Sequence, residues 1–133
     1  MTKNILYLNR RAPHGTQYAQ EGLEVALIGA AFDQIVTVAY IDDGVFQLRR
    51  NQDTSETGTK NWTAALQVLG EYEIKKIYVE RESLAERGMT QSDLVALTYE
   101  DEEDAYAEKP LIQVVGSEEV AVLIADADVL LNF

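Results

Sequence analysis

An almost uninterrupted apolar run, IVTVAYI at residues 35–41, constrains the fold of this chain more than any other feature. The run is short, rich in β-branched side chains and free of the polar alternation that marks a half-exposed strand. It therefore predicts a strand that is covered on both faces, as in a parallel sheet packed between helices.

The residues that follow this strand combine carboxylates with apolar side chains. Asp42 and Asp43 precede a glycine, and a second apolar cluster then appears where a solvent loop would be polar: Val45, Phe46 and Leu48. In open α/β sheets, functional residues gather beyond the carboxyl ends of the strands. An apolar loop at this place either folds back on its own domain or docks on another chain. We expect the second and take these three residues as candidate interface anchors.

Strands and helices alternate along the rest of the chain. The patterns predict strands near residues 4–8, 74–79, 111–115 and 128–133, and helices near 16–32, 61–69, 82–87 and from 117 onward. The chain has 133 residues, which is the length of one domain. We expect a single α/β domain, residues 1–133, with three layers and a mainly parallel sheet between helices. The charge run at 99–109 is expected to be solvated surface.

The predicted first helix is apolar over most of its circumference. Val25, Ile28 and Phe32 lie outside its main apolar face. A helix of this kind is usually buried on more than one side. The second side is covered either by a loop or by a neighbouring subunit, so these residues join the candidate interface.

Composition excludes several classes of function. The formal net charge of -12 repels phosphate backbones, which argues against direct nucleic-acid binding. The absence of cysteine excludes disulfides, thiolate metal sites and a cysteine nucleophile on this chain. No apolar run approaches the length of a membrane span, and the first residues become charged too early for a signal peptide. We expect a cytoplasmic protein without a membrane segment, and no nucleotide-cofactor motif is present.

Three sets of residues are weighed as chemical sites. His14 lies in a Pro/Gly loop after the first strand, but no partner for acid–base work can be identified, so a structural role is favoured. Asp42 and Asp43 could hold a magnesium ion, although an Asp-Gly turn needs no metal, because glycine supplies the positive φ. Arg10 and Arg11, with His14, form a weak candidate anion-binding site, and a salt-bridged surface is the favoured alternative.

Four segments resemble a known family. They are APHGT (residues 12–16), DDGVFQL (42–48), LGEYEI (69–74) and SLAERG (83–88), and they occur in the order and at the spacing of the DsrF/TusC family, within the DsrE/DsrF/DsrH superfamily. The segments YLNRRAPHGT, LIGAAFDQ and QDT, together with Lys60-Asn61, resemble the DsrF branch more than the TusC branch.

The resemblance implies a DsrE-like fold, with a five-stranded parallel sheet between helices, and membership of a heterohexamer. The sister subunits would be of DsrE/TusD and DsrH/TusB type. The sulfur-carrying cysteine would belong to the DsrE/TusD-type chain, which exchanges persulfide sulfur with a DsrC/TusE-type carrier. In the DsrF branch the relay serves dissimilatory oxidation of stored sulfur, and in the TusC branch it serves 2-thiouridine synthesis in tRNA.

The lack of cysteine agrees independently with such a division of labour, because a chain without a thiol cannot hold a persulfide. We therefore expect a non-catalytic subunit of a DsrEFH-like relay that assists persulfide transfer, with no catalytic residue, metal or cofactor of its own. A TusC-like subunit is the alternative within the family. Two alternatives of other classes are an autonomous small-anion-binding α/β module and an enzyme that uses His14 with Asp42 or Asp43.

Overall fold

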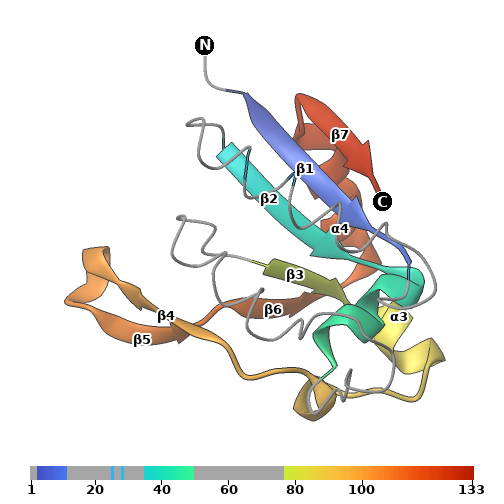
Figure 1. Ribbon diagram of the computed structural model, residues 1–133, viewed down its shortest axis with the longest axis horizontal. Helices are drawn as coiled ribbons and strands as arrows, with labels where there is room; N and C mark the ends of the chain where they lie inside the picture. The colour runs from blue at the N-terminus through green and yellow to red at the C-terminus, as the bar shows by residue number, and fades with distance from the viewer. Residues whose placement is uncertain (1–2, 12–24, 26–27, 29–34, 50–76) are drawn as a thin grey trace.

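The computed structural model describes residues 3–11, 25, 28, 35–49 and 77–133, and this part of the chain is built around a five-stranded parallel sheet (Figure 1). The strand order is β6-β3-β2-β1-β7. The strands are β1 (Asn4–Asn9), β2 (Ile35–Tyr40), β3 (Ile77–Glu80), β6 (Ile112–Val115) and β7 (Val129–Asn132). The apolar run that begins at Ile35 is thus a parallel strand flanked on both sides, as its composition predicts.

Helical elements follow most of the strands. They are η1 (Asp42–Leu48), α3 (Arg81–Glu86), η2 (Gln91–Asp93), η3 (Glu102–Asp104) and α4 (Ser117–Asp126). Val25 and Ile28 both have helical backbone, and the remainder of the predicted helices at 16–32 and 61–69 lies outside the described residues. None of the helices in the described ranges is long and apolar enough to cross a membrane.

The sheet is covered on both faces. On one face, Leu6, Leu8 and Ala39 pack against Leu123 and Ala127, and we call this the α4 face. The opposite face packs under η1 and α3. Its buried cluster contains Tyr7, Val38, Tyr40, Val45, Leu48, Ile77, Val79 and Leu84. The described elements therefore form three layers with the sheet in the middle.

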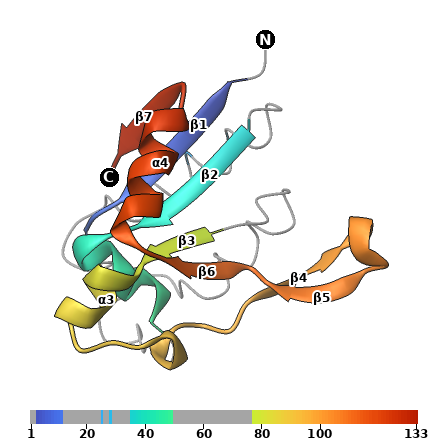
Figure 2. The same ribbon diagram turned by 180° about the vertical axis from the view of Figure 1, so that it is seen from behind.

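The topology contains one reversal. The chain crosses the sheet in one direction, from β1 through β2 and β3 to β6, and α4 then returns so that β7 pairs with the other side of β1. Figure 2 shows α4 lying across the sheet near β1 and β7. The carboxyl ends of β1 and β7 therefore form the topological switch point, where open α/β sheets usually bind their ligands.

The segment after β2 differs from the expected interface loop. It is the 3-10 helix η1, and Val45 and Leu48 are both 0% exposed in the core of this chain. The segment folds back on its own domain, because packing these two side chains against the sheet removes their apolar surface from water. Phe46 is half-buried and packs against the same core.

The glycine of the DDG sequence has a different role from the one expected. Asp42, not Gly44, adopts the positive φ, at 50°. A Cβ added to Gly44 would lie 2.0 Å from the Asn9 carbonyl oxygen. Glycine is thus required because η1 passes directly against the end of β1.

Residues 98–110 form an antiparallel hairpin of β4 (Thr98–Asp101) and β5 (Ala107–Pro110) that extends away from the sheet (Figure 1). Its turn residues Ala105 and Tyr106 have positive φ, as tight hairpin turns require. Lys109 pairs with Asp101 and Asp104, which raises the pKa of its ammonium group. Most of the side chains at 98–108 are exposed, so the charge run is solvated surface, as expected.

A hydrogen bond joins α3 to the start of α4. The Ser117 backbone N–H donates to Glu82 Oε2 at 2.6 Å. The side-chain and backbone hydrogen bonds with Ser117 lower the pKa of the Glu82 carboxyl. Ser83 and Ser117 lie inside their helices, and Gly116 occupies the N-cap of α4.

We predict that Gly44→Ala destabilises the fold by about 1–3 kcal/mol, because the added methyl group must push η1 away from β1. Urea denaturation measures this. Gly116→Ala is the matched control, since a Cβ there meets its nearest heavy atom, Arg81 NH1, at 3.6 Å. The control should cost less than about 1 kcal/mol. Equal losses in the two variants would contradict the close-approach explanation.

We also predict that Ser117→Pro raises the pKa of Glu82 while α4 persists. Proline fits the first position of a helix, and Gly116 already has the extended backbone that precedes a proline. Because the Glu82 pKa is lowered on folding, its contribution to stability is present above the unfolded pKa and is lost as pH falls through the folded pKa.

The stability difference between wild type and Ser117→Pro should therefore be largest at neutral pH and shrink in acid. A carboxyl-detected NMR titration and denaturation at several pH values would measure both effects. A Glu82 pKa that does not change in the variant would refute the assignment.

Candidate functional site

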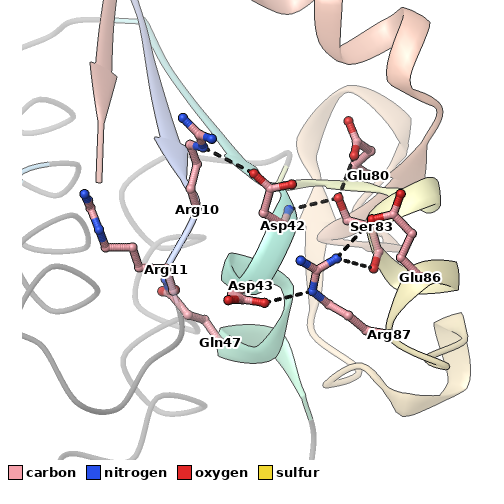
Figure 3. A network of polar contacts seen from close by, with 9 residues as sticks. All are labelled: Arg10, Arg11, Asp42, Asp43, Gln47, Glu80, Ser83, Glu86 and Arg87. Atoms are coloured by element: carbon pink, nitrogen blue, oxygen red, sulfur yellow. Dashed lines mark hydrogen bonds and ion pairs between the residues drawn. The ribbon is translucent and has the colours of Figure 1, made fainter.

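A charged cavity lies at the topological switch point. Its volume is about 490 Å³, and its lining includes Arg10 and Arg11 after β1, Asp42 and Asp43 in η1, and Asn132 at the end of β7. These residues come from three segments that are distant in sequence and meet because parallel strands end at the same edge. Figure 3 shows the side chains around the η1 part of this edge.

An ion pair joins the ends of β1 and β2 across this cavity. Arg10 Nε lies 3.3 Å from Asp42 Oδ2, and the two side chains are 51% and 45% exposed. A pair this exposed contributes about 0–1 kcal/mol to stability. Its main effect is to orient the Arg10 guanidinium and to offset its charge.

A buried serine holds Asp42 in its left-handed backbone conformation. The Asp42 N–H donates to Ser83 Oγ at 2.9 Å, and Ser83 Oγ donates in turn to Glu80 Oε1. Ser83 is 1% exposed, so its hydroxyl is fully used inside the domain. Asp residues tolerate positive φ better than most, and here the hydrogen bonds from α3 stabilise that conformation.

Two further contacts fix η1 (Figure 3). Arg87 Nε lies 3.0 Å from Asp43 Oδ1, and the Arg87 guanidinium also donates to the Ser83 carbonyl oxygen at 3.1 Å. The buried Gln47 side chain donates from Nε2 to the Arg11 carbonyl oxygen at 2.8 Å. Asp42 and Asp43 are thus each paired with an arginine.

The sequence-based candidates fall into three groups. Arg10 and Arg11 do meet the Asp42–Asp43 pair, whereas His14 and Phe32 lie outside the described residues. Among the candidate interface residues, Ile28 is 56% exposed, and Val25 is half-buried against the core. Val45 and Leu48 are core residues, which corrects their assignment to a surface that contacts another chain.

Sequence reasoning missed Glu80, Ser83, Arg87 and Asn132. Ser83 and Arg87 belong to the SLAERG segment that carries the family resemblance, but that segment gives no sign of the contact with η1, which depends on the packing of α3. Glu80 stands at a strand end, and this position was the available signal for it, since carboxyl ends of strands collect polar residues.

The arrangement has limited chemical capacity. The chain has no cysteine, and Ser83, the serine beside a carboxylate, is buried and inaccessible to a substrate. No group of His, Asp and Glu side chains suited to a metal ion occurs within the described ranges. Two arginines and two aspartates balance one another in the cavity lining. The described lining of the cavity therefore supplies charged and polar groups that can bind or position a polar ligand.

We predict that Asp42→Asn increases the affinity of this cavity for sulfate by about threefold to tenfold, because the substitution removes the charge that offsets Arg10. Asparagine also tolerates the positive φ of this position. An NMR titration of the arginine side chains measures the affinity. Glu102→Gln, on the exposed hairpin, makes the same change in net charge elsewhere. An equal gain in that control would show that net charge alone is responsible.

Comparisons with known proteins all lead to the same family. The family model for the DsrE/DsrF-like family matches residues 3–133. The "Intracellular sulfur oxidation protein DsrF" of Allochromatium vinosum is 48% identical over 133 residues, which is 100% of this chain and 98% of that protein. A "Protein TusC homolog" of Vibrio parahaemolyticus is 40% identical over 91 residues, 68% of this chain and 77% of that protein.

Solved structures show the same architecture. The structure of the YchN protein from E. coli superposes with a TM-score of 0.74 at 16% sequence identity, with 100% of both chains covered. At that identity the likeness concerns the fold alone. With the match of the family model to nearly the whole sequence, these findings show that the chain belongs to the DsrE/DsrF-like family.

Proposed function

We propose that this chain is a non-catalytic subunit of a hetero-oligomeric sulfur-relay complex of the DsrF type, which acts in the oxidation of stored sulfur. The observation that carries the proposal is the full-length similarity to DsrF in a chain that has no cysteine. Persulfide sulfur is transferred when the thiolate of one cysteine attacks the outer sulfur of a persulfide on a second cysteine. A chain without a thiol can take no covalent part in that step.

The role left to such a chain is to complete the assembly and to shape the site around a neighbour's cysteine. The neighbours would be a DsrE/TusD-like subunit that holds the persulfide and a DsrH/TusB-like subunit, with a DsrC/TusE-like carrier as the exchange partner. The described residues of the switch-point cavity support this role, because Ser83 is buried, Arg10 is paired with Asp42, and Asp43 is paired with Arg87.

The DsrF type is favoured over the TusC type by the sequence identity at full length. DsrF is 48% identical over 100% of this chain, whereas a "Protein TusC" from Buchnera aphidicola, which covers 98% of it, is 28% identical. A TusC-like subunit in a relay that thiolates tRNA is the alternative within the family.

A small-anion-binding module is the second candidate function. One observation favours it, namely that two arginines line a cavity at the switch point of a parallel sheet. The two aspartates in the same lining oppose it, because they offset the positive charge that would attract an anion. We rank this function below the relay subunit.

The test is coexpression with the DsrE-type and DsrH-type chains of the same genome. The three chains should copurify as one heteromer by size-exclusion chromatography with light scattering and native mass spectrometry. After incubation with a persulfide donor, labelling of sulfane sulfur should appear on the DsrE-type chain. A chain that stays apart from both candidates and turns over a sulfur substrate alone would refute the proposal.

A further inference from the structure

The α4 face carries large apolar side chains that the described fold leaves exposed. Val122 is 57% exposed and Ile124 38% exposed on α4, Leu130 is 43% exposed on β7, and Ile35 is 57% exposed at the start of β2. Leu130 pairs with Leu6, and Ile35 pairs with Asn4. Because Leu6 and Ala39 pack on the α4 side, this register places Leu130 and Ile35 on the same face of the sheet as α4. We call these four residues the α4 surface.

The strand order explains why this face is incompletely covered. Within the described part of the chain, α4 is the element that lies over it. A helix of 10 residues is about 15 Å long and about 10 Å wide. Five strands span about 19 Å across the sheet. One such helix shields the middle of the face and leaves apolar positions open at the edge strand β7 and at the start of β2.

The middle of α4 is apolar on both of its sides. Val120 is buried and Leu123 half-buried on the side that faces the sheet, whereas Ala121, Val122 and Ala125 are exposed on the other side. The charged residues Glu118, Glu119 and Asp126 lie toward the two ends of the helix. An apolar middle of this kind is typical of a helix that packs on more than one side.

The charges around this surface indicate what kind of partner would cover it. All charged residues of α4, Glu118, Glu119 and Asp126, are acidic. Asp126 lies in the last turn, where the helix dipole disfavours a negative charge. No ion pair involving these three residues occurs among the described residues. Glu119 accepts a hydrogen bond from the Gly116 backbone N–H at 2.5 Å, and lysine or arginine side chains on a partner would pair with Glu118 and Asp126.

A second copy of this chain fits poorly. In a two-fold dimer through this surface, each acidic rim would face its own copy, on a chain that already carries a net charge of -12. Charge complementarity therefore favours a different chain over self-association.

We propose that the α4 surface docks a sister subunit of the sulfur-relay complex, through an apolar patch on that subunit bordered by lysine or arginine side chains. This inference rests on the proposed function and adds to it the place of contact and the chemistry of the partner. Val122 is the expected anchor, because it is more exposed than Ile124, the other large apolar side chain that α4 leaves open.

The experiment uses the coexpressed complex with the DsrE-type and DsrH-type chains. Val122→Asp should weaken assembly by about tenfold or more, measured by light scattering over a dilution series. The denaturation midpoint of the isolated chain should not change, since this side chain points into solvent. Tyr106→Asp is the matched control, because it adds the same charge at a 64% exposed aromatic residue on the hairpin tip, where assembly should be unaffected.

Asp126→Lys separates docking from folding. The substitution places a positive charge at the C-terminus of α4, so the isolated chain should be as stable as wild type or more stable. Assembly should nevertheless weaken, and its dependence on salt should decrease. A variant that loses both assembly and stability would overturn the charge argument.

The outcomes distinguish the two proposals. A wild-type heteromer that assembles equally well with Val122→Asp overturns the α4 surface as the docking site and leaves the proposed function standing. A homodimer of the isolated chain that Val122→Asp disrupts overturns the assignment to a different chain. Wild-type protein that binds neither sister chain overturns the proposed function, and this inference with it.

Discussion

The pairing of β1 with β2 is the interaction on which the rest of the structure depends. Residues 6–9 and 38–40 are all buried, so these two strands must be covered on both faces at once. Burial raises the pKa of the Tyr40 phenol, which keeps its hydroxyl protonated in the core. Covering one face draws η1 and α3 onto the sheet, and covering the other requires α4. The switch-point cavity lies at the end of β1, because β2 pairs with one side of this strand and β7 with the other, so the chain connections run in opposite directions from it.

The two faces are completed to different degrees. Opposite α4, η1 inserts Val45 and Leu48 into the core, and Ser83 and Arg87 of the α3 region fasten it by hydrogen bonds to Asp42 and Asp43. Within the described residues, the α4 face receives one helix, α4, and retains exposed apolar residues. An apolar surface with an acidic rim fits the proposed role of a supporting subunit.

Much of the architecture could be predicted from local patterns. The run at 35–41 specified a buried parallel strand, because a strand in contact with helices on both faces has no position for polar alternation. Arg10 and Arg11 were weighed as part of one candidate site and Asp42 and Asp43 as another, and the structure brings the four together because they follow neighbouring strands of one sheet. The partners Ser83 and Arg87 were not, because their place depends on how α3 packs against η1, and sequence spacing carries no record of that contact.

The sequence by itself determined the fold class, the family and the lack of a sulfur-carrying residue, since each of these is written in side-chain type and order along the chain. Tertiary structure decided which apolar residues are core and which remain exposed. Val45 and Leu48 were expected to face another chain and are instead packed inward, while Val122 and Leu130 remain open to solvent. The physical reason is that burial depends on the area that neighbouring elements can cover, and that area is fixed by strand order and helix length, not by the hydrophobicity of any one segment.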